Sequence, residues 1–341
     1  MPEMPDNVIL SVKNLKKHFP IRKGFLRRSS GAVKAVNGVD FFIPSGETLG
    51  LVGESGCGKT TLGRVIVRAL EPTAGQILFR TSQGVIDLAG LGKSELKNVR
   101  SHIQMIFQDP YSSLNQRMTI LDIISEPLIN FGHTRKECEE RVSELLDMVG
   151  LNPRYMQRYP HSFSGGQRQR IGIARALALN PSLVVADEPV SALDVSVQAQ
   201  VLNLLMDLQK QMQLTYLFIS HDLSVVRYIC DRVAVMYVGY IVEMAGTDQL
   251  YSKPRHPYTS TLLSAVPEAS PHIPWNYSVL SGEVADPAAD RQGCAFAPRC
   301  QYASDICSQE IPSLHDVSLP GEDGHYVACH FADKIELEGV S

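Results

Sequence analysis

Two short motifs contain the residue types needed to bind a nucleotide and hydrolyse it. Residues 53–60, Gly-Glu-Ser-Gly-Cys-Gly-Lys-Thr, match the phosphate-loop pattern G-x-x-x-x-G-K-[ST] at every fixed position. Glycines let backbone N–H groups turn inward around the β- and γ-phosphates, Lys59 supplies a neutralising charge, and the Thr60 hydroxyl is a Mg²⁺ ligand. The other expected nucleotide contacts of this segment are Gly53, Ser55, Gly56, Cys57, Gly58 and Thr61. A glycine-rich turn without nucleotide is the alternative, which the preceding apolar strand and the following helix disfavour.

The second motif is the acidic pair Asp187–Glu188, which follows the apolar run Leu183–Ala186. A carboxylate at the end of a buried strand suits Mg²⁺, which prefers one or two carboxylates together with phosphates, so Asp187 is the expected metal ligand. Glu188 can orient or deprotonate the attacking water. Helix capping would explain either acid alone, but not both acids between four apolar residues and Pro189. Together the two motifs predict hydrolysis of a nucleoside triphosphate.

Composition restricts the class of protein. The chain has 341 residues, 44% of them hydrophobic and 20% charged, so it can bury at least one large core. A net charge of −4 gives no global basic field for nucleic acid. Residues 1–7 lack the regions of a signal peptide, and no apolar stretch approaches the roughly 20 residues of a membrane-spanning helix. We therefore expect a soluble cytoplasmic protein, with reduced or metal-bound thiols among its seven cysteines.

The apolar periodicity predicts an α/β fold with an inserted helical segment. Strands are expected at 9–12, 39–43, 48–52, 76–79 and 103–107, with a helix from Thr60 to about Ala69. The basic segment 22–31 is interpreted as a solvated hairpin tip, or else as a contact with a membrane surface or partner. Residues from about 110 to 162 have helical spacing punctuated by prolines.

Strand and helix alternate again after Ser164: a helix to about Leu179, a strand at 183–186, a helix at 195–212 and a strand at 215–220. This order implies a mostly parallel sheet with helices on both faces. Beyond 254 the composition changes to prolines, small residues and four cysteines. We expect a nucleotide-binding domain at 1–254, with a helical lobe at about 110–162, and a separate C-terminal extension at 255–341.

Five motifs in this order resemble the nucleotide-binding subunit of ATP-binding cassette (ABC) transporters. They are Gly53–Thr60, Ser164-Gly165-Gly166-Gln167, Asp187–Glu188, Ser191-Ala192-Leu193-Asp194 and His221, and the resemblance covers residues from about 8 to 250. It implies a P-loop NTPase fold with an antiparallel N-terminal β region. It also implies a head-to-tail dimer in which two ATP molecules lie between the phosphate loop of one subunit and the Ser164–Gln167 element of the other. Phe163 stands where the family usually has leucine.

The same resemblance assigns further site residues. Gln108 matches the glutamine that links the lobes, senses Mg²⁺-ATP and contributes to the metal site, and His221 matches the histidine that contacts the γ-phosphate. Asp194 belongs to the expected nucleotide-binding set. Phe19 is the candidate for stacking on adenine, with Phe41 and Phe42 nearby. Because no site residue of the family is missing, the resemblance implies a site competent for hydrolysis.

The tail resembles the C-terminal extension of dipeptide and oligopeptide importer ATPases, most closely the F-type of their two ATPase subunits. The matching segments are Arg255-His256-Pro257-Tyr258-Thr259 and Gly293-Cys294-Ala295-Phe296-Ala297-Pro298-Arg299-Cys300. This resemblance implies a second, related ATPase chain as dimer partner, two transmembrane permease subunits, and indirectly an extracytoplasmic peptide-binding protein. It places the chain peripherally at the cytoplasmic face of the inner or plasma membrane, without nucleic acid.

Four cysteines of the tail, Cys294, Cys300, Cys307 and Cys329, are separated by 5, 6 and 21 residues. This is not the paired C-x-x-C of most structural zinc sites, and spacing alone leaves a metal site and four buried thiols both open. Four thiolates suit zinc or an iron–sulfur cluster, and His325 or His330 could replace one ligand. The importer resemblance favours a [4Fe–4S] cluster on the four cysteines, with zinc second. Cys57, inside the phosphate loop, is not expected to be a metal ligand, and its side chain is expected only to fill space.

Three alternatives to peptide import are importers of other cargo, a soluble ATPase and a redox regulatory protein. The same type of ATPase serves importers of nickel, glutathione or sugars, and nothing in the chain contacts the cargo, so peptides are the expectation rather than a deduction. A soluble ATPase acting on DNA or ribosomes would usually have two such domains or a long coiled-coil insertion, and neither is visible. A redox regulatory protein is disfavoured as the main role because the hydrolytic set is intact.

Overall fold

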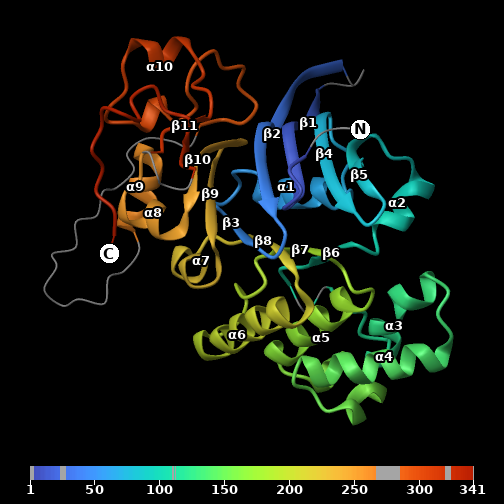
Figure 1. The fold of residues 1–341 in the computed structure, drawn as a ribbon. Helices are drawn as coiled ribbons and strands as arrows, with labels where there is room; N and C mark the ends of the chain where they lie inside the picture. Colours follow the sequence, from blue (N-terminus) through green and yellow to red (C-terminus); the bar gives the residue numbers. More distant parts are fainter. Residues whose placement is uncertain are drawn as a thin grey trace, which may run out of the picture. The chain divides into compact units, whose positions relative to one another are not determined.

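The computed structural model describes residues 4–23, 28–109, 111, 113–265, 285–318 and 324–340. The chain divides into two compact units (Figure 1). The first unit comprises Met1–Leu10, Ile43–Thr48 and Phe79–Ile219, and the second comprises Ser11–Phe42, Leu49–Leu78 and Ser220–Ser341.

Parallel strands form the sheet of the first unit. β7 (Leu183–Asp187) pairs in parallel with β6 (Ile103–Ile106) and with β8 (Thr215–Ile219). Every residue of β7 and β8 is buried, which explains why both strands are continuous apolar runs rather than alternating ones. The predicted strands at these positions and their parallel arrangement are confirmed.

Helices make up most of the rest of the first unit, and four of them lie together in Figure 1. These are α3 (Ile120–Asn130), α4 (Arg135–Met148), α5 (Gly165–Leu177) and α6 (Val195–Met212). The shorter elements are β5 (Gly84–Asp87), η1 (Leu88–Gly90), α2 (Lys93–Val99), η2 (Pro153–Gln157) and η3 (Pro160–Ser162). The predicted helical character between 110 and 162 is therefore confirmed.

Side-chain caps and apolar faces explain these helices. Thr134 and Glu137 form a capping box at the start of α4, and Thr119 caps α3. The buried faces are those expected from the spacing, with Ile120, Ile123, Ile124 and Leu128 on α3 and Val142, Leu145 and Leu146 on α4. Burial of these faces, rather than helix propensity, stabilises the pair.

The sheet of the second unit changes from parallel to antiparallel pairing. β3 (Thr48–Val52) runs parallel to β9 (Arg232–Tyr237), and β9 pairs antiparallel with β10 (Tyr240–Gly246). The two-residue strands β12 (Tyr326–Val327) and β11 (His315–Asp316) continue the sheet antiparallel from β10. The C-terminal segment is thus attached to the sheet through backbone pairing.

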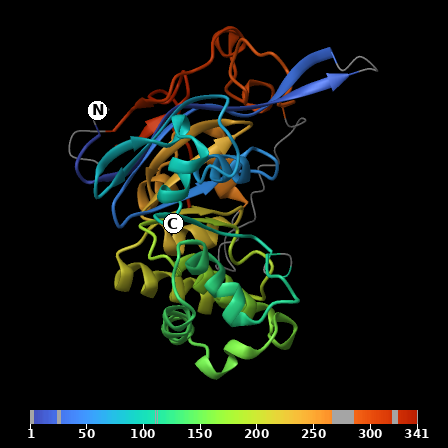
Figure 2. The ribbon, with the colours of Figure 1, turned by 90° about the vertical axis from the view of Figure 1, so that its right-hand side faces the viewer.

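A long hairpin opens the second unit. β1 (Val8–Lys23) lies between β2 (Arg28–Pro44) and β4 (Ala74–Thr81), which confirms the antiparallel N-terminal β region. Figure 2 shows the two blue strands extending together. Residues 24–27, in the basic segment 22–31, lie outside the described residues, so the interpretation of that segment stays a prediction.

The remaining elements of the second unit are short. They are α1 (Lys59–Ile66), α7 (Leu223–Ile229), α8 (Thr247–Ser252), α9 (Pro257–Ser264), η4 (Ala297–Arg299) and α10 (Asp305–Gln309). Across the described ranges, every helix falls short of the length and apolar character that a membrane crossing would require.

Candidate active site

The phosphate loop connects β3 to α1 within the second unit. Gly53, Gly56 and Gly58 all have positive φ, and a Cβ on Gly58 would overlap the backbone oxygen of Ala35. The Lys59 ammonium group is buried and donates to the carbonyl oxygens of Gly53 (2.6 Å) and Glu54 (2.9 Å). The loop therefore holds its lysine through its own backbone, in a conformation that requires glycine.

The start of α1 lies directly behind this loop. Its N-cap, Gly58, has no side chain and so makes no capping hydrogen bond at the positive end of the helix. Thr60 and Thr61 are in the first turn. Such an arrangement suits an anion such as a nucleotide phosphate.

Cys57 is buried inside the phosphate loop. Burial raises the pKa of its thiol, which therefore stays protonated at neutral pH. Its Sγ lies 3.8 Å from the Lys59 ammonium nitrogen. The expectation that this side chain fills space fits its surroundings.

The acidic pair lies at the end of β7 in the first unit. Asp187 is the last strand residue and is 1% exposed, whereas Glu188 is half-buried and has a φ of 47°. Left-handed backbone is costly for a residue with a Cβ, and such strain concentrates at functional sites. The Glu188 N–H donates to Ile219 O at 2.9 Å, and its carbonyl accepts from the Ser191 hydroxyl at 3.1 Å. The backbone around Glu188 is thus fixed from both sides.

The side chain of Glu188 also has a specific partner. The Gln108 amide nitrogen donates to a Glu188 carboxylate oxygen at 2.7 Å. Gln108 follows β6, which is paired with β7, so parallel pairing brings two residues 80 positions apart into contact. This contact aims the carboxylate in one direction.

The Ser164–Gln167 element begins α5. The Ser164 hydroxyl accepts from the Gln167 N–H, and the Gln167 side chain accepts from the Ser164 N–H, which forms a capping box. A Cβ on Gly166 would overlap a methyl group of Val197 on α6, so the glycine permits close packing of the two helices. Phe163 is buried and packs edge-on against Tyr155.

Asp194 caps α6 in the same unit. Its carboxylate accepts from the Val197 N–H (3.0 Å) and from the Ser196 hydroxyl (2.7 Å). These hydrogen bonds, that of Ser196 first, lower the pKa of Asp194 and keep it charged. Asp194 therefore has a clear structural role, whatever else it contacts.

His221 and Phe19 belong to the second unit. His221 is exposed after β8 and directly before α7. Among the three candidate aromatics, Phe41 is buried and the Arg232 guanidinium lies 4.6 Å from the centre of the Phe42 ring. Phe19 is 38% exposed, which favours it as the residue that stacks on a base.

Within the first unit the structure brings together Gln108 with Glu188, and Gly166 with the segment after Asp194. The second unit contains the phosphate loop, His221 and Phe19.

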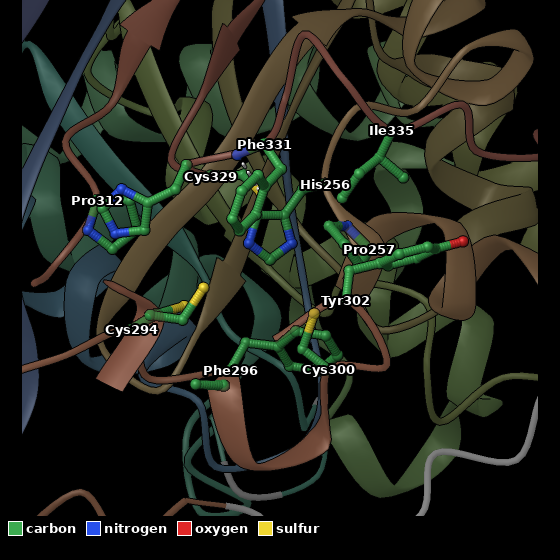
Figure 3. A pocket seen from close by; sticks show the side chains of 13 residues that line it. His256, Pro257, Cys294, Phe296, Cys300, Tyr302, Pro312, Cys329, Phe331 and Ile335 are labelled. Carbon is green, nitrogen blue, oxygen red and sulfur yellow. Dashed lines mark hydrogen bonds between the residues drawn. The ribbon is translucent and has the colours of Figure 1, made fainter. Parts of the chain in front are cut away.

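The four cysteines of the tail line one small, apolar pocket of about 20 Å³. Phe296, Pro312, Phe331 and Ile335 are among its other walls, and Figure 3 shows the sulfur atoms of Cys294 and Cys300 pointing into it. Burial raises the pKa of Cys294 and Cys300, and raises that of Cys329 to about 11. In the part of the chain that the structure describes, no group of three or more His, Cys, Asp or Glu is arranged as a metal site.

The two histidines considered as alternative ligands have other partners. His325 lies 2.7 Å from the fully buried Glu243, and His330 lies 3.0 Å from Glu310 O. His330 nevertheless lines the pocket, whereas His325 does not.

Sequence reasoning overlooked the residues that contact the second position of the phosphate loop. Arg299 forms a two-pronged ion pair with the Glu54 carboxylate, and the Tyr258 hydroxyl accepts from the Glu54 N–H. Both lie in the tail motifs noted above, but the sequence gives no sign of their partner, which is more than 200 positions away.

A phosphate loop that follows a parallel strand, together with an acidic pair at the end of another, defines an ATP-binding protein of the P-loop class. Two family models match the chain: ABC transporter at residues 36–191, and oligopeptide/dipeptide transporter, C-terminal region, at residues 242–307.

Full-length relatives agree with these matches. The oligopeptide transport ATP-binding protein AppF of Bacillus subtilis is 53% identical over 94% of this chain and 97% of its own. A probable peptide ABC transporter ATP-binding protein of Sinorhizobium fredii, y4tS, is 51% identical over 95% of this chain and 90% of its own. The chain belongs to the ABC transporter family, in the branch of ATP-binding subunits with the oligopeptide/dipeptide C-terminal region.

A solved structure supports the fold. The ATP-binding cassette MJ0796, as a dimer in a post-hydrolysis state with ADP and Pi, superposes with a TM-score of 0.61 at 29% identity, covering 70% of this chain and 99% of that one. The P-loop fold and the ATPase activity predicted from the motifs are thereby confirmed.

Proposed function

We propose that this chain is the ATP-hydrolysing subunit of an importer of di- and oligopeptides. The observation that carries hydrolysis is the Glu188 carboxylate, held by the Gln108 amide at 2.7 Å directly after the buried Asp187. The peptide cargo is supported by relatives whose names specify peptide or oligopeptide transport, and by the C-terminal region match.

Each site residue has a role in this proposal. The loop backbone and Lys59 bind the phosphates, and Phe19 stacks on adenine. Thr60, Asp187 and Gln108 would hold Mg²⁺, whose charge neutralises the phosphate oxygens. Glu188 orients the attacking water and accepts its proton, and His221 contacts the γ-phosphate. The fixed backbone and the Gln108 contact preorganise Glu188 for this task.

A second ATPase chain completes the site. In this proposal the Ser164–Gln167 element and Asp194 face the ATP bound to the phosphate loop of the partner. Support comes from the capping box, which fixes the N-terminal end of α5, where a helix favours negative charge. The partner is a related but different chain, as in importers with two kinds of ATPase subunit.

The nucleotide-binding domain connects ATP binding to the permease. Residues 1–254 act as the nucleotide-binding domain, and their helical lobe at about 110–162 transmits closure of the dimer to two permease subunits. An extracytoplasmic binding protein delivers the peptide. The chain therefore works at the cytoplasmic face of the membrane, bound peripherally through the permease.

The extension at 255–341 holds a [4Fe–4S] cluster on Cys294, Cys300, Cys307 and Cys329, with zinc as the second choice. The residue types suit a cluster, because four thiols line a single apolar pocket. Among the described residues, however, the thiols are not arranged as a metal site. Four cysteine ligands are the donor set of such clusters. A bound cluster would cross-link the extension or make it sensitive to oxidation and reduction.

The test is uptake of a labelled di- or tripeptide by cells whose only copy of the subunit carries Glu188→Gln. The substitution keeps the shape and removes the base, so turnover should fall by at least about 10²-fold and uptake should be lost. Glu140→Gln is the matched control, because Glu140 is exposed on α4 and pairs only loosely with Lys136 at 3.9 Å. Co-purification of permease subunits from the same cells tests the partnership.

The outcomes separate the cargo from the catalysis. Unchanged uptake with wild-type ATP turnover in Glu188→Gln would refute the role of Glu188. Absence of peptide uptake in cells with the wild-type protein, together with intact ATPase activity, would refute the peptide cargo and direct the same assay to nickel, glutathione and sugars.

A further inference from the structure

The C-terminal extension is joined to the phosphate loop by one buried arginine. The Arg299 guanidinium donates to both Glu54 carboxylate oxygens, at 2.8 and 3.1 Å. The Arg299 side chain is 5% exposed and that of Glu54 is 25% exposed. A two-pronged, charge-assisted pair of this kind fixes both direction and distance. Glu54 is the second residue of the phosphate loop and has no assigned part in nucleotide binding.

Glu54 is held by its backbone as well as by its side chain. Its N–H donates to the Tyr258 hydroxyl at 2.9 Å, and Tyr258 is fully buried. The Tyr258 ring packs against Tyr237 and Phe296, with ring centres 4.6 and 5.4 Å apart. Arg299 also reaches the Tyr237 hydroxyl at 3.5 Å. Tail residues therefore contact this loop position from two sides.

Arg299 lies in the segment 294–300, which lines part of the four-cysteine pocket. Arg299 ends η4, where its N–H donates to Phe296 O at 2.9 Å, and the next residue is Cys300. The Cys294 N–H donates to Cys307 O at 2.8 Å, which closes the segment into a loop around the pocket. Figure 3 shows Cys294, Phe296 and Cys300 on the walls of this pocket. Arg299 is therefore bonded directly to two residues that line the pocket, Phe296 through its N–H and Cys300 through the peptide bond.

We propose that Arg299 positions the phosphate loop for ATP. We further propose that the conformation of the four-cysteine pocket sets the affinity for ATP, because Arg299 links the pocket to the loop. This inference rests on the ATPase function proposed above. Arg299 offsets the negative charge of Glu54, whose backbone oxygen lies 2.9 Å from the Lys59 ammonium nitrogen. Without the arginine, an unpaired carboxylate would stand at the start of the loop and repel the phosphates. The freed loop would also lose the geometry in which it holds Lys59.

The first experiment measures the Kd of a fluorescent ATP analogue with Mg²⁺ on the purified full chain, and the KM for ATP on that chain assembled with its partner ATPase subunit. In Arg299→Gln, Kd and KM should rise about tenfold, as expected for loss of a buried charge-assisted pair, while kcat changes less than about twofold. Arg299→Lys keeps the positive charge but loses the two-pronged geometry, so its Kd and KM should lie between those of the wild type and those of Arg299→Gln. Arg291→Gln, in the same segment and bonded to Asp286 O, is the matched control and should bind as wild type does.

A double variant tests whether the unpaired Glu54 charge causes the loss of affinity, and the melting temperature of Arg299→Gln distinguishes this from mere instability. If the unpaired Glu54 charge weakens binding, Glu54→Gln combined with Arg299→Gln should regain most of the lost affinity. An Arg299→Gln chain that melts at a lower temperature but keeps the wild-type Kd would overturn the proposal. A wild-type chain that binds no Mg²⁺-ATP would instead overturn the proposed function, and this inference with it.

Hydrogen–deuterium exchange tests the connection to the pocket. Because coupling between sites is reciprocal, Mg²⁺-ATP should slow exchange in residues 294–307 of the wild type, and this protection should disappear in Arg299→Gln. Equal exchange in the wild type with and without Mg²⁺-ATP would overturn the coupling to the pocket.

Discussion

At the scale of single residues, Glu188 shows what the sequence could and could not reveal. The apolar run before the acidic pair predicts the strand, which is confirmed, and a catalytic role for the second acid, which stays a prediction. Its φ of 47° and its contact with Gln108 could not be predicted, because both depend on how β6 and β7 pair. The sequence supplies the chemical groups, and strand pairing supplies their direction.

Gln108→Glu should make hydrolysis depend on pH. A second carboxylate within 2.7 Å of Glu188 would make the two acids share one proton up to a higher pH, since neighbouring like charges resist joint ionisation. We expect turnover at pH 7 to fall about tenfold and to recover as pH rises, with the rising limb shifted upward by at least about one unit. ATPase activity measured from pH 6 to 10 checks this.

Gln104→Glu is the control for that variant. Gln104 is on β6, four residues earlier, and its amide donates to Arg100 O rather than to Glu188. The pH profile of this variant should match that of the wild type. A Gln108→Glu profile with a uniform loss at every pH would show that Gln108 acts through shape and not through the charge state of Glu188.

At the scale of elements, two helices owe their contact to one glycine. The Ser164–Gln167 motif was recognised as a functional pattern, but Gly166 also lets α5 approach Val197 on α6. Asp194, another predicted site residue, caps that same helix. Residues of the predicted ligand-binding motifs therefore also position elements, a structural role that spacing along the chain does not reveal.

Gly166→Ala should therefore destabilise the chain. Its Cβ would overlap the stiff, β-branched Val197, so the free energy of unfolding should fall by about 1–3 kcal/mol. Gly172→Ala in the same helix is the matched control. Its Cβ would meet nothing within 4 Å, and alanine should stabilise the helix by up to about 1 kcal/mol. Urea unfolding of both variants measures the difference.

A third variant identifies the cause. Val197→Ala, combined with Gly166→Ala, removes the overlapping methyl groups and should restore part of the lost stability. Equal stability of Gly166→Ala and Gly172→Ala would mean that the close approach of the helices contributes nothing.

At the scale of the whole molecule, apolar periodicity predicted strands and helices as far as β8, because these depend on residues close in sequence, and the alternation of strand and helix predicted the parallel pairing. The elements between α7 and α8 were not predicted. The contacts of the tail were not predictable. Arg299 and Glu54 are 245 positions apart, and neither carries a pattern that indicates the other. Likewise, burial of the Glu243 carboxylate depends on His325 and on the N–H groups of Arg255 and His256, which only the folded tail brings together.

The four cysteines of the tail are also brought together only by folding, as the ligands of a metal cluster would have to be. They span residues 294–329 and line a single apolar pocket, so a cluster bound there would cross-link the extension. Anaerobically purified protein should contain about four iron and about four acid-labile sulfide ions per chain, and Cys300→Ser should lose both. Cys138→Ser, at a buried thiol on α4, is the control and should keep them.

Metal content and melting temperature together distinguish a [4Fe–4S] cluster, a zinc ion and four metal-free thiols in this pocket. Because a metal bound only by the folded chain stabilises it, removal of the cluster should lower the melting temperature of the wild type and leave that of Cys300→Ser unchanged. About one zinc per chain without sulfide would replace the cluster by a zinc site. Absence of both metals from fresh anaerobic protein would leave four thiols, that of Cys307 buried and the other three half-buried, whose only role is to pack the apolar pocket.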